Sequence, residues 1–449
     1  MRMIPLAAST FFMVSGGPYA IEDILGGAGY LKALLILLIL PVIWSLPTAL
    51  MIGELASAIP AEGGFYVWVR RALGPFWGYQ EAWLSLTASV FDMAIYPAFA
   101  VLYLGKLFPA LTTGHRSMVW SLLIVVICVL WNLRGAPSVG GGSVWLFGLL
   151  LAPFAVLVAA ALWHARHTVH AQGHLGAPPG ANLSTAILVA LWNYMGWDNA
   201  STVAREVENP QRNYPRAMAL STTMVAITYI VPIVAVALAG ISVAQFSTGS
   251  WTDAAQSLCG HGLFIAIVVG GVISGVGMFN VLMMSYARLP MALAQDRMLP
   301  SWMARTNRRG VPVAAIMACG AAWALALNFT FERLISLDLI LYGASLILEF
   351  IALAVLRKKE PDLVRPFRIK GRGMAMLVGI PPTALILFAM YVARTERVGR
   401  MPALLFGLII AAAGPCFYWL SRRFWGTHGP GTSEELSEGV DGHSCRANQ

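Results

Sequence analysis

The sequence predicts an all-α polytopic membrane protein, and two observations carry this prediction. The first is composition: of 449 residues, 58% are hydrophobic and only 11% are charged, with a mean hydropathy of +0.70. A soluble domain of this length needs far more charged surface. The second is spacing, because apolar runs of about 20 residues, long enough to cross a bilayer, recur along the whole chain. Together these observations predict twelve transmembrane helices.

The expected spans are 4–29, 32–57, 76–105, 118–133, 142–163, 184–204, 217–240, 262–287, 312–331, 338–356, 374–393 and 402–421. Most of the 30 Lys and Arg residues fall on alternate loops, which share one side of the membrane. This bias predicts that both termini are cytoplasmic. Residues 422–449 are rich in Gly, Ser and Glu and are predicted to form a disordered cytoplasmic tail.

The first span is interrupted in its middle. Ser15, Gly16, Gly17 and Pro18 are poor helix formers, because glycine adds backbone freedom and proline lacks an N–H group. A break facing lipid would leave backbone groups unpaired, so this one is expected to face protein or a wet cavity. Two carboxylates, beginning with Glu22, follow directly. Intramembrane acids are costly, so they indicate function.

The sixth span is interrupted in the same way, by a glycine and polar groups followed by an acid. Two broken segments in corresponding halves of a chain point to the central site of a transporter. Two kinked packing helices are the alternative. Tryptophans flank this second break, and an indole face can hold an ammonium group with about 1–2 kcal/mol. The residues of interest are Trp192, Asn193, Tyr194, Gly196, Trp197 and Asp198.

Two further spans carry polar stripes. In the third span the stripe follows steps of 4, 4, 3 and 4 residues, which places its members on one helix face. Asp92 lies deep in this span, and it lines a site or makes a structural hydrogen bond. In the tenth span Glu349 is either a protonatable carboxyl or a structural hydrogen-bond donor. The members are Glu81, Ser85, Ser89, Asp92 and Tyr96 in one stripe, and Tyr342, Ser345 and Glu349 in the other.

Several classes of protein are excluded by missing motifs. The five cysteines have no CxxC spacing, which argues against a zinc site. The chain contains no P-loop and no GxSxG elbow, and no nucleophile–base pattern, so it is not expected to be an enzyme. Four histidines in the loop 164–182 (His164, His167, His170 and His174) lack an accompanying acid or thiol. We therefore expect no metal and no cofactor. The net charge of +9 lies in loops, so no nucleic-acid partner is expected.

Four stretches resemble the amino acid–polyamine–organocation superfamily. They are VSGGPYAIED (14–23), GELASAIPAEGGFY (53–66), WNYMGWDNAS (192–201) with EVENP (206–210), and RLP (288–290) with AQDRMLP (294–300). The residues of the segments SGGPYAIED and WDNAST most resemble those of the polyamine-uptake branch. The resemblance covers nearly the whole chain.

The resemblance implies a leucine-transporter-type fold. Two inverted five-helix repeats, 1–163 and 184–356, would be followed by two further helices in 374–421. It also implies alternating access around a midplane site. Carried over residue by residue, the substrate contacts fall on Ser15, Gly16 and Gly17 in helix 1 and on Trp192, Asn193, Tyr194 and Gly196 in helix 6. Asp198 matches a position that is acidic in some members with cationic substrates.

We therefore expect a permease that imports amino acids or polyamines across the plasma membrane. Glu22 and Asp198 satisfy the positive helix ends that would otherwise hold a substrate carboxylate, which favours a cationic amine. The same two acids are alternatively helix caps. Because the spans contain deep acids and no lysine in helix 5, H⁺ is the expected coupling ion, with Glu22, Asp198 or Glu349 changing protonation. Membrane lipid is the other partner. A neutral amino acid permease or exchanger and a non-transporting sensor or partner-dependent subunit are the alternatives.

Overall fold

The computed structural model describes residues 1–167, 176, 180–243, 246–328, 331–371, 373–394, 396–398 and 400–426. The chain is almost entirely helical in these ranges. The helices are α1 (Met3–Val14), α2 (Glu22–Leu40), α3 (Leu46–Ala58), α4 (Phe65–Leu73), α5 (Pro75–Leu107), α6 (Pro109–Thr112), α7 (His115–Asn132), α8 (Ala136–His167), α9 (Leu183–Trp192), α10 (Pro210–Leu238), α11 (Trp251–Cys259), α12 (His261–Tyr286), α13 (Arg288–Gln295), α14 (Val313–Leu325), α15 (Phe331–Lys359), α16 (Met374–Ala393) and α17 (Ala403–Phe424).

Short segments of other types join these helices. A π-helical turn, η1 (Pro41–Ser45), connects α2 to α3. Four 3₁₀ segments are η2 (Trp197–Thr202), η3 (Ala204–Glu206), η4 (Ser301–Ala304) and η5 (Ala326–Asn328). Two-residue strands, β1 (Arg397–Val398) and β2 (Met401–Pro402), pair antiparallel, with Val398 opposite Met401.

Nine helical segments of the described ranges are long and apolar enough to cross a membrane. The longest, Glu22–Ala58, contains a non-helical residue, Gly29, with φ 71° and ψ 171°, at the expected boundary between the first two spans. The expected spans 4–29 and 184–204 are each divided by a break, and α14 is short, so these three do not count as separate long helices. The all-α membrane class is confirmed, whereas the number twelve stays a prediction.

Two expected features fall partly outside the described residues. The predicted tail, 422–449, lies outside from residue 427 onward, and α17 continues to Phe424, three residues past the expected end of its span. His170 and His174 also lie outside. Within the described ranges, no group of three or more His, Cys, Asp or Glu side chains is arranged to hold a metal ion.

Both predicted breaks are present. α1 ends at Val14, and the backbone is non-helical until Glu22, with Gly17 at φ 77° and Ala20 at φ 66°. α9 ends at Trp192, and η2 begins after Gly196, whose φ is 91°. A Cβ atom at Gly196 would overlap the backbone oxygen of Met13. The second break therefore packs its backbone against the last turn of α1, which only glycine permits here.

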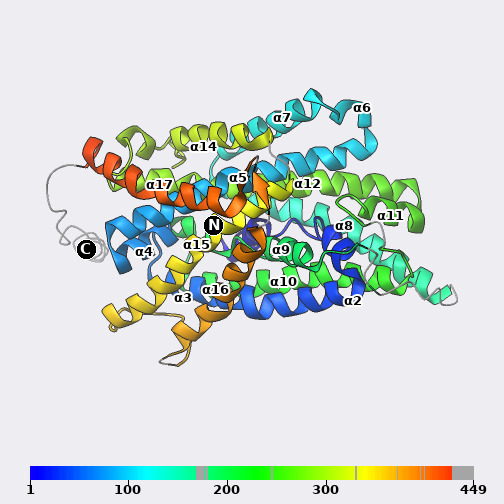
Figure 1. Cartoon of the computed structure of the whole chain (residues 1–449), viewed down its shortest axis with the longest axis horizontal. Coiled ribbons are helices and arrows are strands. Elements are labelled where there is room, and N and C mark those ends of the chain that lie inside the picture. Colours follow the sequence, from blue (N-terminus) through cyan, green and yellow to red (C-terminus); the bar gives the residue numbers. More distant parts are fainter. Residues whose placement is uncertain are drawn as a thin grey trace, which may run out of the picture.

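The centre of the bundle is formed by α5, which packs extensively against α12 and α15. Figure 1 shows α9 near the middle of the bundle, and α7, α14 and α16 nearer its edges. Glycines of α12 allow close contact, because a Cβ at Gly271 would overlap the Tyr103 ring and one at Gly275 would overlap Ala100. Small residues at helix crossings are the usual means of close packing in membranes.

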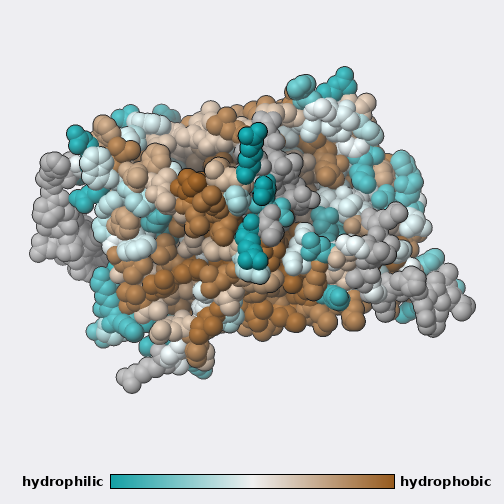
Figure 2. All heavy atoms as spheres, viewed as in Figure 1, coloured by the Kyte–Doolittle hydropathy of each residue, from teal (hydrophilic) through white to brown (hydrophobic). Residues whose placement is uncertain are grey.

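The outer surface is apolar in its middle. Figure 2 shows hydrophobic residues over much of the central part of one face, interrupted by a hydrophilic strip, with hydrophilic residues gathered at both ends. Exposed large side chains include Trp145 and Leu325, each 78% exposed. An apolar belt between polar ends is the surface that a bilayer requires.

Candidate functional site

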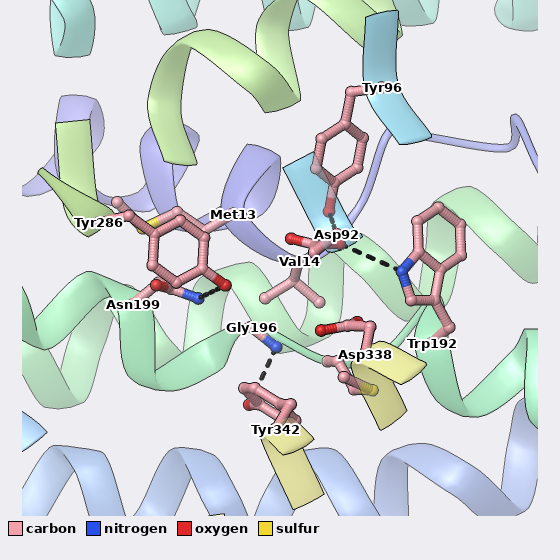
Figure 3. A pocket seen from close by; sticks show the side chains of 11 residues that line it. Met13, Val14, Asp92, Tyr96, Trp192, Gly196, Asn199, Tyr286, Asp338 and Tyr342 are labelled. Carbon is pink, nitrogen blue, oxygen red and sulfur yellow. Dashed lines mark hydrogen bonds between the residues drawn. The ribbon is translucent and has the colours of Figure 1, made fainter. Parts of the chain in front are cut away.

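A buried cavity lies where the two helix breaks meet. About 260 Å³ of space lies between its lining side chains, a total that includes the narrow gaps between atoms. Its walls come from α1, α5, α9, η2, α12 and α15 and from the turn between α9 and η2 (Figure 3). The lining residues are Met13, Val14, Asp92, Tyr96, Trp192, Met195, Gly196, Asn199, Tyr286, Asp338 and Tyr342.

Asp92 is held in this cavity by two aromatic side chains. Its Oδ1 accepts hydrogen bonds from the Tyr96 hydroxyl (2.6 Å) and from the Trp192 indole N–H (3.2 Å). The two rings stack at 6.1 Å with an interplanar angle of 24°. Within the described chain both hydrogen bonds recorded to Asp92 end on Oδ1. The arrangement fixes one carboxylate oxygen against the Tyr96 and Trp192 side chains.

Three carboxyl groups gather at this point. Asp338 of α15 lines the cavity with Asp92, and Asp198 of η2 accepts a hydrogen bond from Tyr342. The three lie close enough to repel one another when charged. Asp198 lies in the first turn of η2, whose N-cap position is Gly196, and no side-chain hydrogen bond caps η2 within the described residues. The cap role and the site role of Asp198 both stay predictions.

The sequence reasoning missed Asp338. It lies four residues before Tyr342, so it continues the stripe of Tyr342, Ser345 and Glu349 at a helical step. Asp338 is the first residue of the expected tenth span, 338–356, where an acid is expected to lie at the membrane surface rather than inside the bundle. α15 begins seven residues earlier, at Phe331, which places Asp338 inside the bundle with 2% of its surface exposed.

A second cavity of about 230 Å³ adjoins the first, and Tyr96 and Trp192 line both. Its other walls are mainly aromatic and apolar, with Gly16, Asn193 and Ser274 as the polar exceptions. Ser274 donates a hydrogen bond to the backbone oxygen of Gly16 (2.7 Å), which ties the first break to α12. Of the described residues, neither Lys nor Arg lines either cavity, and the two acidic lining residues, Asp92 and Asp338, both belong to the first cavity.

Six of the predicted contact residues line neither cavity, namely Ser15, Gly17, Glu22, Tyr194, Trp197 and Asp198. Ser15 accepts a hydrogen bond from the Gly17 N–H (3.0 Å), which stabilises the break itself. Tyr194 donates to the backbone oxygen of Leu37, so its hydroxyl faces the neighbouring helix. Trp197 is fully buried, and its indole N–H has no partner in the described ranges. Glu22 forms a separate cluster.

The Glu22 cluster lies at the start of α2. One carboxylate oxygen accepts hydrogen bonds from the Tyr103 hydroxyl and from the N–H of Gly249 (3.1 Å). Tyr103 packs edge-on against Tyr19, a lining residue of the second cavity, with ring centroids 5.1 Å apart. Tyr103 and Tyr19 therefore lie between Glu22 and the second cavity. Glu22 does not line the first cavity, which Asp92 and Asp338 line.

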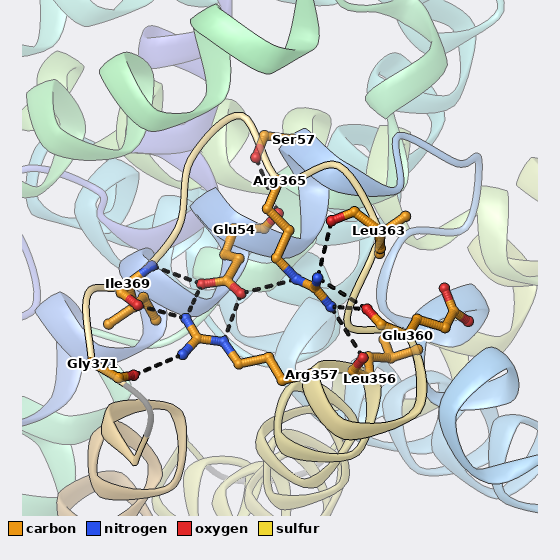
Figure 4. A network of polar contacts seen from close by, with 9 residues as sticks. All are labelled: Glu54, Ser57, Leu356, Arg357, Glu360, Leu363, Arg365, Ile369 and Gly371. Carbon is orange, nitrogen blue, oxygen red and sulfur yellow. Dashed lines mark hydrogen bonds and ion pairs between the residues drawn. The ribbon is translucent and has the colours of Figure 1, made fainter.

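Two polar networks close one end of the bundle. Glu54 is completely buried and pairs with Arg357 and Arg365, and it also accepts from the N–H of Ile369 (2.8 Å; Figure 4). Burial lowers the pKa of Arg365, which Glu54 opposes. These contacts fasten the α15–α16 connection to α3.

The second network surrounds Arg288, which is buried at the start of α13. Arg288 pairs with Glu206 and lies 3.9 Å from Glu62. Burial raises the pKa of Glu62, and the nearby Arg288 charge opposes this shift. The N–H of Gly63 donates a hydrogen bond to the backbone oxygen of Thr202 (3.2 Å). The 53–66 motif is therefore bonded to the last residue of η2, the segment that follows the second break.

Comparisons with known proteins agree on one family for this chain. A family model described as amino acid permease matches residues 7–413. The chain is 33% identical to polyamine transporter PUT1 of Oryza sativa subsp. japonica, over 95% of this chain and 80% of that protein. It is 31% identical to polyamine transporter RMV1 of Arabidopsis thaliana, over 95% and 86%. It is 24% identical to the serine/threonine exchanger SteT of Bacillus subtilis, over 89% and 91%.

Proposed function

We propose that this chain, which belongs to the amino acid permease family, is a secondary transporter that imports cationic amines, polyamines in particular. A permease for amino acids or polyamines follows from the family and from relatives named polyamine transporters. The family consists of permeases rather than enzymes. The preference for a cation is our own step, and one observation carries it: Asp92 and Asp338 line one cavity, Asp198 is bonded to its lining residue Tyr342, and no Lys or Arg of the described residues lines it.

A diamine fits such a compartment. It carries a positive charge at each end and no carboxylate, so separated acids such as Asp92 and Asp338 match it. Charge-assisted hydrogen bonds contribute about 1.5–3 kcal/mol each. The stacked Tyr96 and Trp192 rings, which separate the two cavities, supply an apolar and π-rich surface for the alkyl chain.

The proposal has finer features as well. The transporter would work by alternating access. It would have twelve spans, of which ten form two inverted repeats (1–163 and 184–356) and two follow in 374–421. The protein would lie in the plasma membrane with both termini cytoplasmic. H⁺ is the proposed coupling ion, with Glu22, Asp198 and Glu349 as the candidate proton carriers. The Glu54 and Arg288 networks support a cycle in which the cytoplasmic end opens and closes, because ion pairs between elements are natural gate contacts.

Asp198→Asn tests the substrate class, because it keeps the shape and removes the charge. In proteoliposomes we expect putrescine and spermidine to bind about 10- to 100-fold more weakly, since 1.4 kcal/mol corresponds to one decade. Asp253→Asn, a change at an exposed acid of α11, is the matched control and should bind as the wild type does.

Two outcomes would contradict the proposal. Unchanged amine affinity in Asp198→Asn would leave Asp198 as a helix cap. Wild-type protein that carries only neutral amino acids would favour a neutral amino acid permease or exchanger, which the similarity to SteT keeps as the second candidate. Substrate that binds without accumulating in vesicles would indicate the sensor alternative.

A further inference from the structure

We infer that Glu81 and Glu349, a pair of buried carboxyl groups on α5 and α15, share the proton that couples transport to the pH gradient. The inference rests on the proposed transport function and goes beyond it, because it adds a second member, Glu81, and a route to the surface. It also separates the proton site from the substrate cavity, which neither residue lines.

The first observation is that these carboxyl groups are buried without adequate partners. Glu81 and Glu349 both have 0% exposure. Neither oxygen of Glu349 has a hydrogen-bond partner in the described chain, and Oε2 of Glu81 lacks one as well. Oε1 of Glu81 accepts from Ser85 (2.8 Å). Burying an ionised carboxylate away from water without compensating contacts costs several kcal/mol of free energy, whereas burying a protonated carboxyl group costs far less.

The second observation is that the two acids lie on helices, α5 and α15, that pack against each other. They are close enough to interact electrostatically, and Glu349 also interacts with Asp198 of η2. The ionisable groups near the pair are Asp198, Tyr342 of α15 itself, and Tyr66 of α4, which is near Glu81. α16 and α17 also pack against α15, and within the described ranges neither contributes a charged group to Glu349. Since no Lys or Arg of the described residues acts on either carboxyl group, a shared proton allows both to remain in one buried interface.

The third observation is a series of protonatable groups on either side of the pair. Toward the cavity, the Tyr342 hydroxyl bonds to Asp198. Toward the surface, the Tyr66 hydroxyl donates to Oδ2 of Asp296 (2.5 Å). Asp296 pairs with Arg70, and their side chains are 20% and 34% exposed. The Glu81–Glu349 pair therefore lies between the substrate cavity and a surface carboxylate.

This placement gives a simple coupling rule. Closure of α5 against α15 requires a proton on the pair, because two ionised carboxylates would repel across the interface. A proton enters while the site faces the acidic side, and it leaves to bulk water once the interface opens on the other side. Only an O–H bond is broken and remade, so no further reactant is needed.

Glu81→Gln and Glu349→Gln test the inference, because glutamine imitates a permanently protonated carboxyl. Three quantities are measured in proteoliposomes: binding of labelled putrescine, putrescine counterflow at equal pH, and uptake driven by a pH gradient. We expect each variant to keep binding and counterflow within about threefold of wild type and to lose gradient-driven accumulation by at least tenfold. Glu208→Gln, which changes an exposed acid, should remain fully coupled.

A spectroscopic measurement keeps the test decisive if a variant transports poorly. Wild-type protein at neutral pH should show an infrared carbonyl band of a buried protonated carboxyl, and this band should shift or lose intensity in each variant because the partner carboxyl is gone. Variants that still accumulate putrescine on a pH gradient, or an unchanged infrared band, would overturn the inference. Wild-type protein that neither binds nor exchanges putrescine would instead contradict the proposed substrate class. Uptake driven by a pH gradient would then be measured with labelled serine.

Discussion

The Tyr342 hydroxyl contacts the second helix break at two points. It accepts a hydrogen bond from the N–H of Gly196 (3.1 Å) and donates one to Oδ1 of Asp198. Because Tyr342 belongs to α15, the same helix that carries Asp338 and Glu349, a change at the break is transmitted directly to that helix. Tyr342 thus joins the cavity lined by Asp92 and Asp338 to the helix that carries Glu349.

Asp338→Asn should weaken amine binding without affecting the fold. Asp338 lines the cavity, and no hydrogen bond to its side chain is recorded within the described residues, so the change removes charge and little else. A lost charge-assisted contact of about 1.5–3 kcal/mol predicts a 10- to 100-fold higher Kd for putrescine. Equilibrium binding to purified protein measures this. Asp362→Asn, on an exposed turn, is the control, and equal affinities for the two variants would remove Asp338 from the site.

Gly17→Leu should abolish uptake while the protein still inserts into the membrane. Gly17 has φ 77°, which costs an L-residue about 1–2 kcal/mol, and a Cβ there would press into the Leu150 side chain. Gly148→Leu is the matched control, because Gly148 lies on α8 with nothing near its Cβ position. Uptake assays after quantifying protein in the membrane compare the two. An active Gly17→Leu protein would show that the geometry of the first break is dispensable.

Glu54→Gln should lower stability strongly. It would leave two buried arginines, Arg357 and Arg365, without their shared carboxylate, and breaking a buried pair costs about 3–5 kcal/mol. Glu360→Gln removes a more exposed ion pair with Arg71, where about 1 kcal/mol or less is expected. Thermal unfolding in detergent gives both values. Similar melting temperatures for the two variants would mean that the Glu54 network does not hold the closed end.

Glu62→Gln should stabilise the protein increasingly as the pH rises. Burial raises the folded-state pKa of Glu62 above its ordinary value of 4.5, so the folded state holds this proton more tightly than the unfolded state. Ionisation of Glu62 therefore opposes folding once the pH exceeds 4.5, and fully so above the raised pKa. The difference in melting temperature between variant and wild type should grow over this window. A difference that is flat with pH, or that shrinks, would contradict this reasoning.

The sequence by itself determined the class of the protein and the position of its two helix breaks. Hydropathy and the conformational limits of Gly16, Gly17, Pro18 and Gly196 are local properties, so they can be read without knowing which helices meet. Helical periodicity likewise grouped Asp92 with Tyr96 correctly, because both lie on the regular part of α5.

The tertiary structure decided which of these residues face the cavity. Glu22, Tyr194 and Trp197 lie in or beside non-helical turns, where side-chain direction depends on individual φ and ψ values rather than on a 3.6-residue period. Asp338 joins Asp92 only through the packing of α15 on α5, helices more than two hundred residues apart in the chain. The association of acids from distant helices depends on how the helices pack, and spacing within any single helix does not encode it.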